Sequence, residues 1–169
     1  MQPFNAAQWL IDRHAEDGRG DRVAVRCLGT ETTYSELRVE LWRVQSMLTE
    51  VGVGPEDRVV MVVQDDLAFP AWFLGAQRSG VIPVPVSTML RGGPLGEIIA
   101  DCGAKVLVLS GTFAAELPEM LRTATAVTDV VVAGEPSAVD APEHVRVHLW
   151  EDWQEIGDQP ATDTMEKLA

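Results

Sequence analysis

Two segments of the sequence carry polar residues where a small-molecule site could form. Ser110-Gly111-Thr112 follows an apolar stretch and precedes a helical pattern, so its backbone N–H groups could hold an anion such as phosphate. Asp65-Asp66 follows another apolar stretch, and in open parallel sheets ligands bind at the carboxyl ends of the strands. We favour a simpler interpretation of each: a common strand-to-helix loop for the first segment, and a helix cap for the Asp pair.

Two further patterns are weaker candidates. His144 and His148 would share one face of a helix, but the alternation of Val145 and Val147 predicts a strand. A strand separates the two rings by about 13 Å, so one metal ion cannot bridge them and we predict no metal site. Gly52-Val53-Gly54 begins like a dinucleotide-binding motif but precedes a strand, and we interpret it as the end of a helix.

The composition is that of an acidic globular domain. The 169 residues carry a net charge of −13, and 46% of them are hydrophobic. This charge argues against nucleic acids and anionic membranes as partners, because binding to phosphates requires clustered Lys and Arg. The apolar stretches are shorter than the roughly 20 residues that span a bilayer, and the N-terminus has no signal-peptide pattern. Cys27 and Cys102 are isolated thiols, so we expect both to be reduced and mostly buried in a cytoplasmic protein.

Hydrophobic periodicity predicts an α/β fold with a mostly parallel, doubly wound sheet, flanking helices and a small N-terminal β-hairpin. The predicted apolar strands are Val59–Val63, Val81–Val86, Lys105–Leu109 and Asp129–Ala133. The two prolines of Val81–Val86 exclude it from regular central pairing along its whole length. The predicted helices between them are Leu67–Arg78, Leu95–Asp101 and Ala114–Arg122, with Arg91-Gly92-Gly93-Pro94 as a loop before the second. Strand and helix alternate, which requires right-handed crossovers between parallel strands.

The N-terminal part is predicted to contain two helices that flank the hairpin. Asn5 is the expected cap of the first helix. The residues at helical spacing in this helix are Ala6, Trp9, Leu10 and Arg13. Thr33-Tyr34-Ser35-Glu36 has the form of a capping box and opens the second helix, which ends at Gly52. The predicted buried face of the second helix consists of Leu37, Leu41, Val44 and Leu48.

Aromatic residues also recur at helix-face spacing. We expect them to belong to the core rather than to a ligand site. They are Trp9, Trp42, Phe69, Trp72 and Phe73.

We divide the chain into one subdomain, residues 1–156, and a tail or linker, residues 157–169. Within the subdomain, residues 1–57 contain the helix, hairpin and second helix, and residues 58–133 form the βαβ core. Residues 134–156 contain a short strand and a short helix.

Several motifs occur in a defined order along the chain. They are D-R-V-A-V from Asp21, T-Y-S-E-L from Thr33, G-V-G-P-E-D-R-V from Gly52, the A-Q-R-S-G-V-I-P-V-P stretch within residues 73–86, and the helix-to-strand stretch of residues 98–108. This order resembles the opening of the adenylate-forming superfamily, whose pattern is D-R-x-A-[VI], T-Y-x-E-L, G-V-x-x-G-D-R-V and A-x-x-x-x-G-[AV]-x-x-x-P. That superfamily comprises acyl- and aryl-CoA ligases, luciferases and the adenylation domains of peptide synthetases. The resemblance extends over residues 4–110.

Within the superfamily, three segments are most similar to the benzoate–CoA ligase branch. They are Phe4-Asn5-Ala6-Ala7 with Gly18-Arg19-Gly20, Phe69-Pro70 before Phe73-Leu74-Gly75-Ala76, and Val86-Ser87-Thr88-Met89-Leu90. The last segment is V-N-T-L-L in that branch, so Ser87 departs from the pattern.

The resemblance implies the first subdomain of the ligase fold and a two-step reaction. In this family a carboxylate attacks the α-phosphate of ATP to give an acyl-adenylate and pyrophosphate, and the thiol of CoA then displaces AMP. ATP, Mg²⁺ and CoA are therefore the cofactors expected for the parent enzyme, and an aromatic or other small carboxylic acid is the expected substrate. In some CoA ligases a basic residue just after the proline-rich strand meets a CoA phosphate, and Arg91 is the nearest candidate, offset by two positions. We favour the simpler interpretation of Arg91 as a solvated loop arginine.

The family's catalytic parts are missing from these 169 residues. The phosphate loop (Y-T/S-S-G-[ST]-T-G-x-P-K-G), the adenine-binding aromatic residue, the ribose-binding Asp and the catalytic Lys do not occur. No catalytic residue is therefore assigned, and the isolated chain is expected to be an inactive fragment that holds none of the cofactors. Its partners would be the remaining ligase subdomains, and the surface that meets them is expected to be apolar and to favour self-association.

Two alternatives stay open. The chain could be a non-catalytic interaction module or one chain of a split ligase. It could also belong to an adenylation domain that loads a carrier protein instead of CoA.

Overall fold

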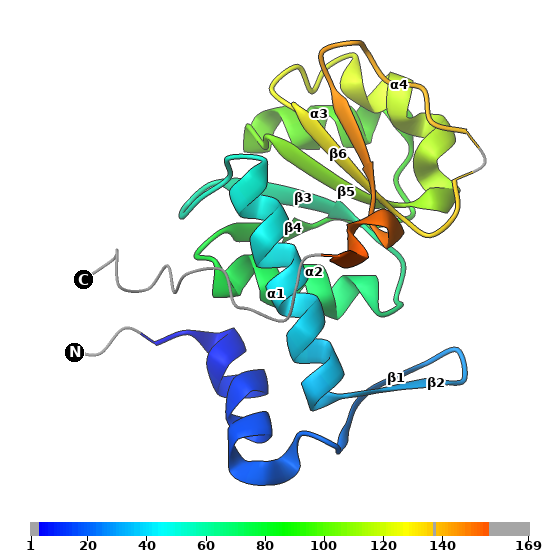
Figure 1. Cartoon of the computed structure of the whole chain (residues 1–169). Coiled ribbons are helices and arrows are strands. Elements are labelled where there is room, and N and C mark those ends of the chain that lie inside the picture. The colour runs from blue at the N-terminus through cyan, green and yellow to red at the C-terminus, as the bar shows by residue number, and fades with distance from the viewer. Residues whose placement is uncertain (1–3, 137, 156–169) are drawn as a thin grey trace. The chain divides into compact units, whose positions relative to one another are not determined.

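The computed structural model describes residues 4–136 and 138–155, which form two compact units (Figure 1). The first unit combines the N-terminal residues up to Pro55 with Asp65–Val81. The second combines Glu56–Gln64 with Ile82–Glu155. In the part of the chain that is described, no helix is long and apolar enough to cross a membrane.

The second unit is built on a five-stranded parallel sheet. Its strands are β3 (Arg58–Val62), β4 (Ile82–Pro85), β5 (Val106–Ser110), β6 (Asp129–Ala133) and β7 (Arg146–Leu149). Their order is β4-β3-β5-β6-β7, and every neighbouring pair is parallel. The chain passes from β3 to β4 and then continues on the other side of β3, which is the strand order of a doubly wound sheet. The predicted fold class is confirmed.

The residue types of the strands match their places in the sheet. Every position of β5 and β6 is buried, because central parallel strands that are covered on both faces are continuously apolar. β4 lies at one edge of the sheet and contains Pro83 and Pro85. An edge position suits these prolines because proline has no N–H to donate to a neighbouring strand.

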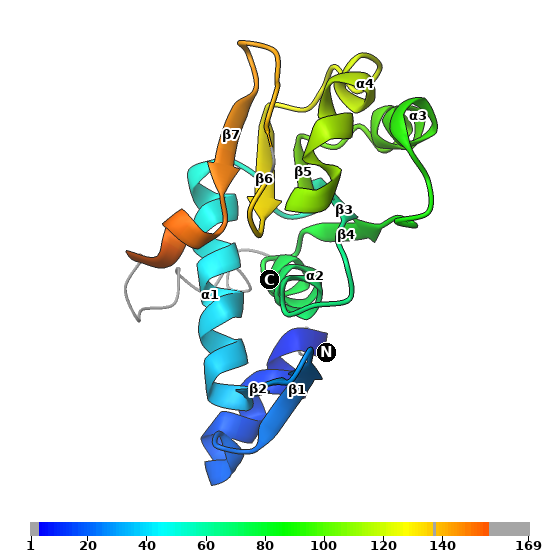
Figure 2. The same ribbon diagram turned by 90° about the vertical axis from the view of Figure 1, so that its right-hand side faces the viewer.

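The helices of the second unit lie side by side against one face of the sheet (Figure 2). They are α3 (Gly92–Cys102), the 3-10 turn η3 (Gly111–Glu116) and α4 (Leu117–Leu121). The core that they form with the strands includes Val60, Val62, Leu95, Ile99, Leu107, Leu109, Leu117, Met120, Val130 and Val132.

Two sequence-based expectations about these helices are wrong. The glycines expected in a loop before α3 form its first turn, where Pro94 is tolerated because the first helical N–H groups have no partner within the helix. The single helix expected over Ala114–Arg122 is instead a 3-10 turn followed by a short α-helix.

Arg58 ties the first residue of β3 to the end of α3. Its Nε donates to the carbonyl oxygen of Cys102 at 2.8 Å, and its Nη2 donates to that of Gly103 at 3.4 Å. The last carbonyls of a helix have no partner within the helix and attract positive charge. The Arg of the D-R-V motif therefore caps a helix in this fold.

The first unit contains a hairpin and two packed helices. The hairpin strands are β1 (Val23–Cys27) and β2 (Thr30–Thr33), and the helices are α1 (Tyr34–Glu50) and α2 (Ala68–Arg78). Figure 1 shows the hairpin leading directly into α1.

The start of α1 is the predicted capping box. The Thr33 hydroxyl accepts the N–H of Glu36 at 3.2 Å, and the Glu36 carboxylate accepts the N–H of Thr33 at 2.7 Å. The predicted apolar face of α1 is buried throughout. Helices α1 and α2 approach closely where Gly75 faces Val44, because a Cβ at position 75 would lie 2.6 Å from Val44 Cβ.

The N-terminal helical segment buries a different face from the predicted one. Asn5 caps it as expected, since its Oδ1 accepts the N–H of Ala7 at 3.0 Å. Trp9 and Leu10, however, are 49% and 43% exposed, whereas Ala7, Ile11 and Asp12 are buried. The buried Ala7 and Ile11 are four positions apart, as the predicted Ala6 and Leu10 are, so the buried face is shifted by one residue along the π-helical turn η1 (Gln8–Asp12) and its flanks. Among the predicted core aromatics, Trp72 is fully buried and Trp9 is not.

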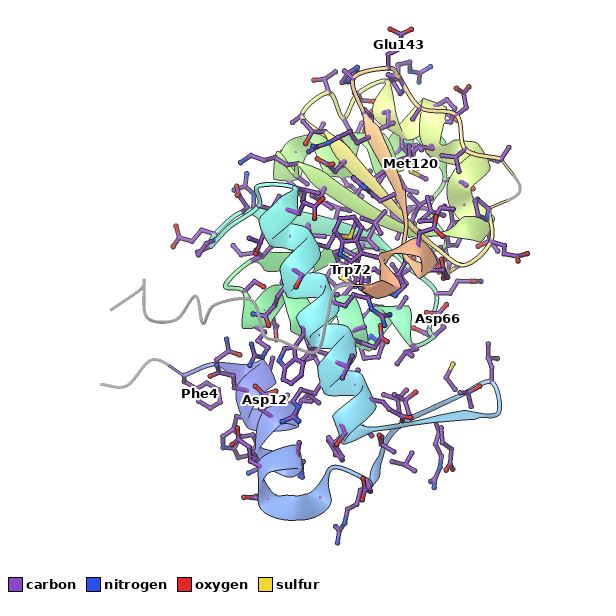
Figure 3. All side chains as sticks on the ribbon, viewed as in Figure 1. Phe4, Asp12, Asp66, Trp72, Met120 and Glu143 are labelled. Atoms are coloured by element: carbon purple, nitrogen blue, oxygen red, sulfur yellow. The ribbon has the colours of Figure 1, made fainter. Side chains whose placement is uncertain are left out.

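Asp12 takes part in a buried polar cluster within the first unit (Figure 3). Its Oδ2 accepts Nη2 of Arg78 at 2.7 Å and Nε of the same residue at 3.1 Å. Nη1 of Arg78 donates to Gln45 at 2.6 Å, and the Asn5 amide donates to the Arg78 carbonyl at 3.2 Å. The cluster therefore joins the N-terminal segment, α1 and α2 through one guanidinium.

We predict that Asp12→Asn lowers the free energy of unfolding by about 3 kcal/mol, because Arg78 would keep a buried charge without its counter-ion. Asp17→Asn is the matched control, since the Asp17–Arg19 pair is largely exposed and should contribute less than about 1 kcal/mol. Urea unfolding followed by tryptophan fluorescence measures both. Equal effects of the two substitutions would contradict the importance of the buried pair.

Glu56 is held in the left-handed region, with φ at 66°, and its side chain is exposed. The superfamily pattern has glycine at this position, between G-V-x-x and D-R-V. We predict that Glu56→Gly raises the free energy of unfolding by about 1 kcal/mol, since relief of the strain exceeds the entropic cost of glycine. Glu50→Gly, at the helical end of α1, should instead lower stability. A loss of stability in Glu56→Gly would show that the conformation is not strained.

Candidate functional site

The carboxyl edge of the sheet is where the topology favours a ligand site. The strand order reverses between β3 and β5, and ligands of open α/β sheets bind at the carboxyl ends of the strands on either side of such a point. Here the loops after these two strands are joined by a hydrogen bond of 2.9 Å from the N–H of Gln64 to the hydroxyl of buried Ser110. The bond holds the two strand ends in register.

The Ser110-Gly111-Thr112 segment is shaped by packing. A Cβ on Gly111 would lie only 2.6 Å from the carbonyl oxygen of Glu135, so glycine is required there without any ligand. The turn that follows is a six-residue 3-10 helix. These features agree with the loop interpretation and give the phosphate interpretation no support.

The Asp65-Asp66 pair has structural contacts. Asp66 Oδ1 accepts the N–H of Ala68 at 2.9 Å, so this carboxylate caps the start of α2, as we favoured from the sequence (Figure 3 labels Asp66). The carbonyl of Asp65 accepts the thiol of Cys27 at 3.1 Å. Cys27 and Cys102 are both free thiols and are half-buried, so the expectation that they are mostly buried was too strong.

Arg91 lies immediately before α3, at the turn that follows β4. Its Nε is 3.1 Å from a carboxylate oxygen of Glu116, and its guanidinium carbon is 5.1 Å from the centre of the Phe113 ring. Nη1 donates to the carbonyls of Leu90, at 2.8 Å, and Thr88. The side chain is nevertheless 56% exposed, so one side of the guanidinium is open to solvent.

The turn before Arg91 explains how Ser87 replaces the asparagine of the benzoate–CoA ligase pattern. The Ser87 hydroxyl accepts the N–H of Met89 at 3.3 Å, and the Ser87 carbonyl accepts the N–H of Leu90 at 3.2 Å. An asparagine side chain stabilises such turns with the same type of bond. Serine therefore preserves the turn that places Arg91.

A second polar cluster occupies the opposite, amino edge of the sheet. Asp129 is completely buried and accepts from four groups: Nε and Nη2 of Arg146, at 2.8 and 2.9 Å, the Thr128 hydroxyl at 2.8 Å, and Nε2 of His148 at 2.8 Å. Burial raises the pKa of Asp129, but the hydrogen bonds from Arg146, His148 and Thr128 outweigh it and leave this pKa below its usual value.

His148 is on β7, whereas His144 lies before that strand and is exposed. In the described parts of the chain no group of three or more His, Cys, Asp or Glu side chains could hold a metal ion.

Sequence reasoning missed the partners of Arg91 and the partners of Asp129. Glu116 and Phe113 lie more than twenty residues from Arg91, and nothing in their local sequence links them to it. Asp129 did carry a signal, because an acid that opens an otherwise apolar buried strand requires partners. Arg146 and His148 alternate on the next strand and were the available donors.

The lowered pKa of Asp129 gives a pH prediction. The stabilisation by ionised Asp129 is complete above its unfolded-state pKa of 3.8 and is lost as the pH falls through the lower folded-state pKa. At neutral pH, Asp129→Asn should lower the free energy of unfolding by about 2 kcal/mol, through the loss of charge-assisted hydrogen bonds. The difference in the free energy of unfolding between this variant and the wild type should shrink as the pH falls below 3.8.

Asp140→Asn is the control for this prediction, because Asp140 is exposed. Urea unfolding at a series of pH values measures the three proteins. The difference in the free energy of unfolding between Asp129→Asn and the wild type could instead stay constant down to low pH. That result would contradict the assignment of an ionised, hydrogen-bonded carboxylate.

The sequence and fold match known proteins over most of the chain. The AMP-binding enzyme family matches residues 11–167. The 4-hydroxybenzoate–CoA/benzoate–CoA ligase of Rhodopseudomonas palustris is 35% identical over 76% of this chain and 25% of its own length. The benzoate–CoA ligase of Thauera aromatica is 35% identical over 78% of this chain and 25% of its own length.

Solved structures agree with these matches. A benzoate CoA ligase from Burkholderia xenovorans superposes with a TM-score of 0.79 and 28% identity, over 95% of this chain and 30% of that one. The chain thus spans about a quarter of the length of the curated relatives that it matches. The motifs, the doubly wound sheet and these matches together establish that the chain belongs to the AMP-binding enzyme family.

Proposed function

We propose that this chain is the N-terminal segment of an ATP-dependent carboxylic acid–CoA ligase whose substrate is an aromatic acid such as benzoate. The observation that carries the proposal is the match to two benzoate–CoA ligases over three quarters of the chain. The turn that contains Ser87 is compatible with this branch, because the serine hydroxyl makes the type of hydrogen bond that an asparagine side chain makes in such turns. Both relatives are named as CoA ligases, so CoA is the acceptor that we propose in preference to a carrier protein.

In the proposed reaction the acid attacks the α-phosphate of ATP, and CoA then displaces AMP from the acyl-adenylate. Mg²⁺ would stabilise the charge that develops on the phosphates. We assign neither ATP nor Mg²⁺ to residues of this segment, since the family's phosphate-loop motif does not occur among the 169 residues. The contribution of this segment is the scaffold that fixes the carboxyl edge of the sheet.

Arg91 is the residue for which we propose direct ligand contact, with a phosphate of CoA. Its place after β4 puts a cation at the carboxyl edge of the sheet. Its guanidinium is oriented by two backbone carbonyls, and more than half of its side chain is open to solvent. Arg binds phosphate well because its planar donors match the oxygen geometry.

We further propose that the remaining ligase subdomains cover apolar side chains at the two edges of the sheet. Ile82 on β4 is 47% exposed, and Val147 and Leu149 on β7 are 38% and 36% exposed. Exposed apolar strand edges promote association with other chains. Self-association of the isolated segment would arise from the same exposed apolar side chains.

The proposal predicts that the purified 169-residue chain does not catalyse benzoate-dependent exchange between ATP and pyrophosphate. A chimaera in which residues 1–155 replace the matching segment of the Thauera aromatica benzoate–CoA ligase should retain this exchange. The native Thauera enzyme is the positive control. Exchange by the isolated chain would contradict the scaffold role and would favour a self-sufficient enzyme. A folded chimaera without exchange would favour a non-catalytic interaction module.

A further inference from the structure

We propose that Glu116 sets the phosphate affinity of the Arg91 site by competing with the ligand as an internal anion. This inference rests on the proposed contact between Arg91 and a CoA phosphate. No sequence motif points to Glu116, and the fold brings its side chain to Arg91.

The Glu116 carboxylate bridges two groups that attract anions. One oxygen lies 3.1 Å from Nε of Arg91, and the other accepts the N–H of Gly92 at 2.9 Å. The first is a guanidinium, and the second is the N–H of the first residue of α3, where the helix dipole favours negative charge. A phosphate that binds Arg91 must therefore share these groups with a carboxylate that already occupies them.

The other contacts of Arg91 decide what a ligand can reach. The carbonyl of Leu90 accepts Nη1, and the ring of Phe113 lies against the guanidinium, so the side chain is held in one orientation. The side chain of Glu116 is only 26% exposed, whereas that of Arg91 is 56% exposed. A phosphate could therefore reach the exposed Arg91 from solvent, and the Glu116 carboxylate 3.1 Å from Nε would oppose it by charge repulsion.

Replacement of Glu116 by Gln separates positioning from competition. The single amide oxygen of Gln can still accept the N–H of Gly92, whereas its NH2 group would face Nε of Arg91 and cannot accept from it. The guanidinium is then oriented by the carbonyl of Leu90 and the ring of Phe113. The negative charge is lost, and with it the repulsion of the incoming phosphate. For a partly exposed pair we expect roughly threefold tighter phosphate binding.

The test uses the chimaera in which residues 1–155 replace the matching segment of the Thauera aromatica benzoate–CoA ligase, because the isolated chain is expected to hold no cofactor. The ligand is adenosine 3′,5′-bisphosphate, which carries the 3′-phosphate of CoA. Isothermal titration calorimetry at low ionic strength gives the apparent Kd for the unaltered chimaera (the wild type below) and for its Glu116→Gln, Arg91→Gln and double variants. Glu116→Gln should bind roughly threefold more tightly than the wild type. Arg91→Gln should bind more weakly, and the double variant should gain nothing over Arg91→Gln.

Glu119→Gln is the matched control. Glu119 faces the start of α3 as well but pairs with Arg122, and its side chain is 57% exposed. The same change of charge should leave the apparent Kd unchanged at this position. The thermal unfolding midpoint of each variant reports any structural effect. A change in Kd without a change in this midpoint excludes a structural cause.

The outcomes distinguish this inference from the proposed function. In one outcome Arg91→Gln binds more weakly, while the binding by Glu116→Gln is unchanged or also weaker. This outcome would overturn the role of Glu116 and leave that of Arg91 intact. Equal tightening by Glu116→Gln and Glu119→Gln would reduce the effect to general electrostatics and also overturn it. Binding that does not depend on Arg91, or no binding by any variant, would overturn both proposals.

Discussion

The burial of the central strands is the constraint on which the rest of the second unit depends. A buried backbone is stable only when its N–H and C=O groups pair along the sheet, and buried strand positions exclude unpaired polar side chains. Polar residues are therefore confined to the ends of the strands, where Arg58 opens β3, Ser110 ends β5 and Asp129 opens β6. Each has a specific partner: the end of α3, the loop after β3, and the donors of β7.

The same constraint explains why the motifs that carry the family resemblance are structural. The Thr33 and Glu36 positions of T-Y-x-E-L form a capping box, and the Arg58 position of D-R-V caps the end of α3. Gly75 permits α1 and α2 to approach each other. A segment whose characteristic residues all serve the fold is what we expect of a scaffold that supports catalytic residues from elsewhere in the enzyme.

Sequence reasoning succeeded where structure is determined locally. The capping box, the apolar face of α1, the apolar strands and the exclusion of the proline-containing strand from regular central pairing all follow from residues within a few positions of each other. It failed where the determinant is distant or unusual. Asp12 pairs with Arg78 across 66 positions, and nothing in the sequence near Asp12 points to this partner. The contact of Arg91 with Glu116 depends in the same way on the packing of α3 beside η3 and α4.

In the proposed function this segment supplies the framework of a nucleotide-activating ligase, and the groups that bind ATP belong to other parts of the enzyme. Isothermal titration calorimetry of the purified 169-residue chain with ATP and Mg²⁺ tests it most directly. The account predicts no saturable heat at millimolar nucleotide. Stoichiometric binding of one ATP per chain with micromolar affinity would contradict it, because the nucleotide would then be held by side chains of this segment alone.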